Sequence, residues 1–150
     1  MELKNFDDVI KFAIAREEDA VDAYGGMAQK AKHPGLKELL LELEEEERNH
    51  KKLLEDITPD KIAALKPEKI IDLKISDYLV EEPPGPEMNF QDLLIFAAKK
   101  EQSAVELYSY IADSTDDADL KKLFEFLVEQ EKAHKFKLEV KYEEHVLEED

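Results

Sequence analysis

The sequence contains no cysteine, and this absence excludes a whole group of metal sites. No thiolate can bind iron or zinc, and no disulfide can form within the chain. Long apolar runs are missing too, because none approaches the ~20 residues that a membrane helix needs. No basic-then-apolar leader opens the chain. We therefore expect a cytoplasmic protein that has no membrane partner.

Basic residues are scarce relative to acidic ones. Lysine and arginine number 21 against 38 aspartates and glutamates, which gives a formal net charge of −17. Nucleic acids and anionic membrane surfaces repel such a chain, so we expect neither as a partner. A length of 150 residues suits one domain with a real core, and we predict a single domain over residues 1–150.

A gapless internal repeat organises the chain. A shift of 84 residues aligns residues 5–54 with residues 89–138. Each copy is predicted to be a helical hairpin, over residues 5–56 and 89–144, because its apolar residues recur with a helical period. Identical pairs include Asn5/Asn89, Phe6/Phe90, Asp8/Asp92, Phe12/Phe96, Ala13/Ala97, Val21/Val105, Leu36/Leu120, Leu39/Leu123, Leu43/Leu127 and Leu54/Leu138.

Local signals predict where the helices begin and end. The first helix is expected over about residues 6–31, with Asn5 as its N-cap. The second is expected to begin near Pro34, since proline fits a first helical turn. The third is expected from Asn89 to about Ala112 and the fourth to run past residue 142. We predict an all-α four-helix bundle on this basis.

Residues 57–88 join the two hairpins. A short helix is expected to follow Thr58 and to reach Leu65, and the alternating residues 71–75 are expected to be extended. An extended chain covers ~3.3 Å per residue, which lets this segment run the length of a ~30 Å helix. We therefore interpret it as a long crossover, which gives an up-down-down-up topology.

Each hairpin contains a glutamate and a histidine three residues apart. Glu47 precedes His50 in the first hairpin, and Glu131 precedes His134 in the second. At 100° per residue, two side chains three residues apart lie only ~60° apart on one helix face, and leucines flank both pairs on that face. A further glutamate, Glu17 or Glu101, precedes each pair by 30 residues on an apolar stripe.

Four carboxylates and two imidazoles are thus predicted to face the interior. Buried carboxylates without a partner are costly, but two divalent cations would balance the four negative charges. Oxygen and nitrogen ligands of this kind suit iron or manganese in a dinuclear site, and affinity alone does not choose between the two metals. The alternative is an acidic helical bundle in which the duplicated pattern no longer binds metal. The predicted ligands are Glu17, Glu47, His50, Glu101, Glu131 and His134.

Other residues are expected to have supporting or ordinary roles. Tyr24 and Tyr108 follow the first glutamate of each hairpin by seven residues, and their hydroxyls either hydrogen-bond ligand carboxylates or only pack in the core. Ala20 and Ala104 are small enough to leave room for metals and a small oxidant. The two remaining histidines, His33 and His145, are expected to be ordinary surface residues.

At these positions the chain resembles the rubrerythrin branch of the ferritin-like superfamily. The resemblance lies in the pattern Glu-x-x-Ala-x-x-x-Tyr followed by Glu-x-x-His, present twice, and in residues 72–79 of the crossover. It implies a ferritin-like four-helix bundle with two iron ions, and reduction of hydrogen peroxide or dioxygen coupled to Fe(II) oxidation. It also implies a homodimer. An enzyme of the peroxidase or ferroxidase type is therefore expected.

Two departures from that family shape the expectation. Many rubrerythrins carry a cysteine-bound iron in a rubredoxin domain, whereas this chain has no cysteine, so a separate electron donor such as a rubredoxin is expected. They also carry an extra glutamate where this chain has Ala104, so the ligand set here is symmetric and closer to that of bacterioferritin. A non-catalytic protein that binds or delivers iron, and a partner-binding bundle, are the alternatives.

Overall fold

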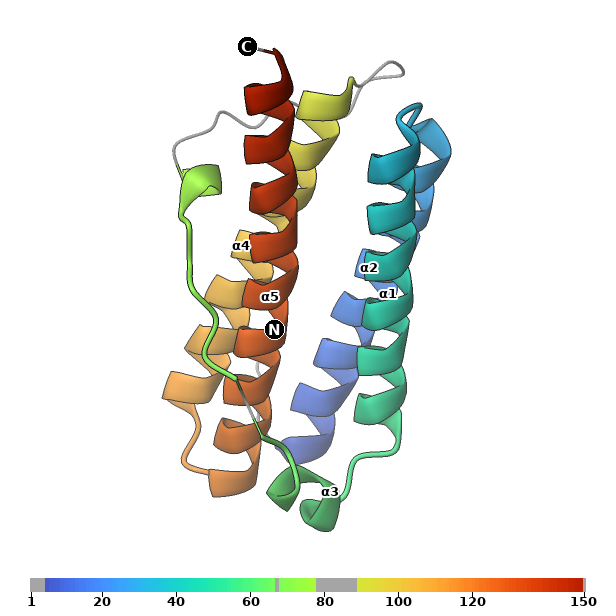
Figure 1. Ribbon diagram of the computed structural model, residues 1–150. Helices are drawn as coiled ribbons and strands as arrows, with labels where there is room; N and C mark the ends of the chain where they lie inside the picture. The colour runs from blue at the N-terminus through green and yellow to red at the C-terminus, as the bar shows by residue number, and fades with distance from the viewer. Residues whose placement is uncertain (1–4, 67, 78–88, 150) are drawn as a thin grey trace. The chain divides into compact units, whose positions relative to one another are not determined.

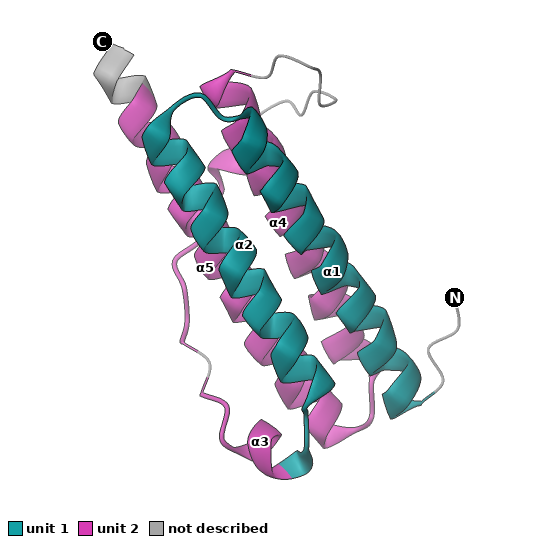
Figure 2. Ribbon diagram, turned by 90° about the vertical axis from the view of Figure 1, so that its right-hand side faces the viewer, with its two compact units in different colours: residues 1–59 teal, residues 60–150 magenta. Residues whose placement is uncertain are grey.

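The structure is a computed structural model that describes residues 5–66, 68–77 and 89–149, the last four of these without their side chains. Within these residues the chain is all-α, as predicted, and contains no strand. Two compact units are distinguished, residues 1–59 and residues 60–150 (Figure 2). The elements in order are α1 (Phe6–Lys30), α2 (Pro34–Glu55), α3 (Pro59–Ala63), η1 (Ile75–Asp77), α4 (Phe90–Ser114) and α5 (Ala118–Glu149).

The first unit is the hairpin of α1 and α2, which lie side by side (Figure 1). Asn5 caps α1 as predicted, since its Oδ1 accepts a hydrogen bond of 2.9 Å from the Asp8 N–H. Helix α1 ends at Lys30, and α2 begins at Pro34, the predicted first-turn proline. Helices α1 and α2 thus both lie within residues 5–56.

The second unit repeats this hairpin with α4 and α5 (Figure 1). Asn89 caps α4 in the same way, because its Oδ1 accepts a 2.8 Å hydrogen bond from the Asp92 N–H. Helix α4 runs to Ser114, two residues beyond the predicted end, and α5 extends through Glu149. The same cap at both repeat positions shows that the two hairpins begin by the same local mechanism.

Each hairpin buries an apolar stripe, and burial of such side chains is the main favourable term in folding. Most of the leucine positions that the repeat shares are fully or almost fully buried, whereas Leu39 is only partly buried. In the first hairpin the buried apolar residues include Val9, Ile10, Ala13, Leu36, Leu40, Leu43 and Leu54. In the second they include Leu93, Leu94, Ala97, Leu120, Leu123, Phe124, Leu127 and Leu138.

The described part of the crossover lies along α5 (Figures 1 and 2). Helix α3 is shorter than predicted, since it ends at Ala63, and residues 68–74 form neither helix nor strand before η1. Lys74 adopts a left-handed backbone with φ of 57°. Successive hydrogen bonds join the two segments in parallel order: Lys122 Nζ to Ala63 O, Ile70 N to Glu129 Oε2, and Ser76 N to Glu139 Oε2.

The crossover is thus held along the second hairpin, as its predicted reach allows. Its residues 78–88 lie outside the described part of the chain. Among the described residues, no helix combines the length and the apolar character that spanning a membrane requires.

Candidate metal centre

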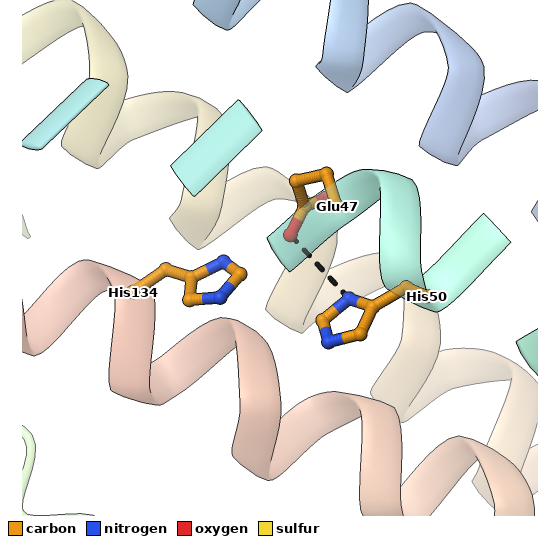
Figure 3. Close-up of side chains that lie close together, drawn as sticks. All are labelled: Glu47, His50 and His134. Atoms are coloured by element: carbon orange, nitrogen blue, oxygen red, sulfur yellow. Dashed lines mark ion pairs between the residues drawn. The ribbon is translucent and has the colours of Figure 1, made fainter. Parts of the chain in front are cut away.

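Glu17, Glu47 and His50 meet inside the first hairpin and are called the first half-site. The Nδ1 atom of His50 lies 3.4 Å from Glu47 Oε1 on the same helix and 3.8 Å from Glu17 Oε2 on α1. Figure 3 shows the Glu47–His50 pair one turn apart on α2. The three residues are 0%, 1% and 7% exposed, respectively. Two carboxylates therefore converge on one imidazole nitrogen away from solvent.

Glu101, Glu131 and His134 meet in the same way inside the second hairpin and form the second half-site. The Nδ1 atom of His134 lies 3.7 Å from Glu101 Oε1 on α4 and 4.0 Å from Glu131 Oε2 on α5. None of the three side chains is more than 3% exposed. Each half-site thus draws one glutamate from the first helix of its hairpin and a Glu-x-x-His pair from the second.

Helical periodicity explains why these polar groups are buried. Leu43 lies four residues before Glu47, and Leu54 lies four residues after His50, so all four share one face of α2. Both leucines are at most 1% exposed. Leu127 and Leu138 flank the second Glu-x-x-His pair at the same spacing and are fully buried. The apolar stripe that drives each hairpin together therefore carries the predicted ligands inside with it.

Burial makes ionisation of Glu17 in the first half-site unfavourable. The pKa of Glu17 is raised from 4.5 to about 8, and loss of hydration is the largest cause. The neighbouring carboxylate of Glu47 contributes to this rise, whereas the hydrogen bond to His50 opposes it. The ionised form of Glu17 is therefore disfavoured in the protein alone, and a cation among these oxygens would reverse that preference.

The tyrosines and alanines predicted near the ligands are also inside the hairpins. Tyr24 and Tyr108 are each 1% exposed. The ring of Tyr108 meets that of Phe124 edge-on, with centroids 5.4 Å apart. Ala104 is 9% exposed, and Ala20 is partly buried. Hydrogen bonding of the tyrosine hydroxyls to ligand carboxylates stays a prediction.

The two other histidines lie outside the half-sites but have structural roles that the sequence pattern did not reveal. His33 is exposed and is the N-cap of α2, with its Nδ1 accepting from the Gly35 and Leu36 N–H groups at 3.1 and 3.4 Å. His145 is half-buried and stacks against Phe90, with ring centroids 4.2 Å apart. Neither residue belongs to a half-site.

A buried charged cluster beside the second half-site was missed by sequence reasoning. Lys135 follows the predicted ligand His134 and is 1% exposed, although a lysine is rarely buried so fully. It contacts Asp72 in the crossover and Glu139 in the next turn of α5. One signal was present: Lys135 lies four residues after Glu131, and therefore on the strip of α5 that carries this predicted ligand.

The six predicted ligands belong to groups of carboxylates and imidazoles that could hold a metal ion. Oxygen and nitrogen donors without thiolate suit iron or manganese. A duplicated helical hairpin with two carboxylates and one imidazole buried in each copy is typical of ferritin-like proteins. The donors present therefore fit the two-iron centre that the sequence resemblance implies.

Comparison with known proteins agrees with this class. The model of the rubrerythrin family matches residues 8–142, which is most of the chain and includes both half-sites. The chain therefore belongs to the rubrerythrin family. Neither the curated proteins nor the solved structures gave a match.

Proposed function

We propose that the protein is a di-iron carboxylate oxidoreductase whose two iron ions are held by the six predicted ligands of the half-sites. The observation that carries the proposal is the convergence of two buried carboxylates on a buried imidazole, repeated in both hairpins. Membership of the rubrerythrin family supports iron as the metal. Manganese is the alternative that the same donors would accept.

The proposed ligands have distinct roles. The four glutamates would hold two divalent cations and balance their charge. His50 and His134 would each bind one ion as a terminal ligand. When bound, two Fe(II) ions would supply the two electrons that convert hydrogen peroxide and two protons into two water molecules. With dioxygen, the same two electrons and two protons would give hydrogen peroxide.

The protein itself would hold the ligands in place, exclude bulk water and bind a proton that is released when metal binds. Glu17 is the residue concerned, because its raised pKa keeps a proton on the carboxyl group at neutral pH in the metal-free protein. Binding of a cation requires the ionised carboxylate, so metal loading should release that proton. The buried leucines around each half-site restrict access of water to its carboxylates and imidazole.

Stopped-flow oxidation of the Fe(II)-loaded protein tests the proposal. We expect rapid oxidation on mixing with hydrogen peroxide or dioxygen, and a loss of that rapid phase in a Glu47→Ala, Glu131→Ala double variant. Oxidation no faster than in the double variant would contradict the proposed activity. Binding of two iron ions without such oxidation would instead assign the protein to iron binding or delivery.

The remaining parts of the proposal concern partners. We propose that a separate electron donor such as a rubredoxin reduces the oxidised centre again, since the given sequence contains no cysteine. A homodimer and a cytoplasmic location stay expectations, and the first is checked by the particle mass in solution. Neither nucleic acid nor a membrane surface is proposed as a partner, because the net charge of −17 repels both.

A further inference from the structure

A lysine directly follows the predicted ligand histidine in each hairpin. Lys51 follows His50, and Lys135 follows His134. The two lysines are equivalent under the 84-residue repeat, so each hairpin places a positive side chain in the same turn as its ligands. The partners that these lysines bind are nevertheless different, and the difference points to a function for the second one.

In the first hairpin the lysine joins the two ligand-bearing helices at the surface. Lys51 Nζ lies 2.8 Å from Glu18 Oε1, and Glu18 directly follows the predicted ligand Glu17 on α1. The two side chains are 28% and 58% exposed, so solvent and salt weaken their attraction. The bridge therefore aligns the ligand turns of α1 and α2 only weakly.

In the second hairpin the equivalent of Glu18 is Gln102, which offers no charge. Its side-chain amide donates to Glu106 on the same helix at 3.1 Å. Lys135 extends instead to the crossover, where its Nζ lies 2.9 Å from Asp72 Oδ1. The lysine side chain is only 2% exposed, so this ion pair is screened far less than the one in the first hairpin.

Glu139 completes the buried cluster. Its Oε1 lies 4.0 Å from Lys135 Nζ, and its Oε2 accepts a 2.8 Å hydrogen bond from the Ser76 N–H of η1. Burial raises the pKa of Glu139, although the Ser76 N–H and the Lys135 charge oppose the shift. The pKa of Asp72 is lowered: desolvation opposes its ionisation, but the bonds from Lys135 and the Lys74 N–H outweigh it.

These contacts leave one close ion pair, between Lys135 and Asp72, with Glu139 at the longer distance of 4.0 Å from the same ammonium group. A buried lysine that loses its partner is strongly destabilised, so the pair resists separation. Lys135 adjoins His134 and lies four residues after Glu131 on α5, so the turn of α5 that the ion pair ties to the crossover is also the turn that carries both predicted ligands.

We propose that Lys135, held by Asp72, is a positioning residue for Glu131 and His134, which makes the crossover part of the support of the metal centre. This inference rests on the proposed function, because it requires that both side chains bind metal. Groups that orient metal ligands from behind typically change metal affinity by ~10–100-fold when they are removed. The surface pair of Lys51 and Glu18 should contribute much less.

Titration of the metal-free, full-length protein with Co²⁺ tests the inference, with the visible absorption of the bound ion as readout. We expect Lys135→Met and Asp72→Asn each to weaken binding of one of two Co²⁺ ions by ~10-fold or more and to change its spectrum. The double variant should bind Co²⁺ no more weakly than the single variant that has the lower affinity, because the two residues act as one pair. Lys51→Met should change the affinity by less than ~3-fold.

The matched control is Lys122→Met. Lys122 also holds the crossover, through its Nζ and the Ala63 carbonyl oxygen at 2.8 Å, but it lies nine residues before Glu131. We expect Co²⁺ affinity within ~2-fold of the wild type for this variant. Helical content of each metal-free variant is checked first by circular dichroism. Asp72→Asn leaves Lys135 buried without its partner, so if that variant does not fold, Lys135→Met, which removes the buried charge, is the deciding variant.

The outcomes are distinct. Folded Lys135→Met or Asp72→Asn protein with wild-type Co²⁺ affinity and spectrum would overturn the inference and leave the proposed function standing. An equal loss of Co²⁺ affinity in Lys122→Met would also overturn it, because any contact that holds the crossover would then have the same effect. Failure of the wild-type protein to bind Co²⁺ would overturn the proposed function and the inference together.

Discussion

The two hairpins contain the same three predicted ligands but surround them differently. In both, a histidine Nδ1 lies within 4.0 Å of two buried carboxylates. In the first hairpin the nearest lysine forms an exposed ion pair between α1 and α2, whereas in the second it forms a buried one with the crossover. The arrangement of the predicted ligands is thus similar in the two hairpins, whereas the contacts of the neighbouring lysines differ.

A second difference concerns how the ligand-bearing helices begin. Helix α2 is capped by the imidazole of His33, and α5 is capped by the carboxylate of Asp117, which accepts from the Asp119 and Leu120 N–H groups at 2.9 and 3.1 Å. These two residues are equivalent under the repeat. The same requirement, an acceptor for unpaired N–H groups, is therefore met by two different side chains.

Removal of metal should have the largest effect, because the buried carboxylates and imidazoles of both hairpins then lose their bound cations. Saturating metal stabilises a folded protein by about 4 kcal/mol at a thousand times Kd. For a chain of this length we expect the metal-free protein to melt about 10 °C lower than the Fe(II)- or Mn(II)-loaded protein. Thermal melting followed by circular dichroism under anaerobic conditions measures the difference. A metal-free protein that melts no lower would contradict a buried centre.

Substitution of Glu17 sharpens the comparison in the metal-free protein. Because its pKa is raised from 4.5 to about 8 in the folded state, the bound proton stabilises that state fully below pH 4.5. This stabilisation is lost as the pH rises toward 8. We expect Glu17→Gln to reduce the fall in unfolding free energy between about pH 5 and pH 8 by about 1 kcal/mol or more. Urea denaturation at several pH values measures it.

The matched substitution is Glu101→Gln in the second half-site. This variant keeps Glu17 and should therefore keep the pH dependence that Glu17 contributes. If Glu17→Gln shows the same pH dependence as the wild type, the raised pKa of Glu17 is not a source of it. If only Glu101→Gln abolishes the pH dependence of the unfolding free energy, the second half-site and not Glu17 is its source.

The smallest effect is expected from exchanging the two caps. His33→Ala and Asp117→Ala should each lower the free energy of unfolding by about 1 kcal/mol, because each leaves two helix N–H groups without their side-chain acceptor. His33→Asp should restore the stability, since aspartate is a good cap and its charge suits a helix N-terminus. Urea denaturation measures all three. A loss in His33→Asp as large as in His33→Ala would show that the imidazole does more than accept these bonds.

Much of the fold followed from local patterns in the chain. Asn5 and Asn89 mark the starts of α1 and α4 because a cap acts within a few residues of itself. The helix ends were less accurate, as α4 continues past the predicted Ala112 to Ser114. The extended reading of residues 71–75 missed the left-handed Lys74 and the 3-10 turn that begins at Ile75.

The burial of the half-site residues could also largely be predicted from the sequence. A Glu-x-x-His pair between leucines must face the same side as those leucines, so burial of Glu47 and Glu131 follows from helical geometry. The role of Lys135 was not readable, because its partner Asp72 is 63 residues away in the sequence. The cap formed by His33 was missed too, since histidine is not among the preferred capping residues.

The amino-acid sequence by itself determined the helices, the repeated hairpins and the six residues predicted to bind metal, because periodicity and capping act over only a few residues. Only the tertiary structure decided how the second half-site is supported. A buried lysine needs a partner of opposite charge, and which carboxylate meets it depends on where the crossover lies along α5.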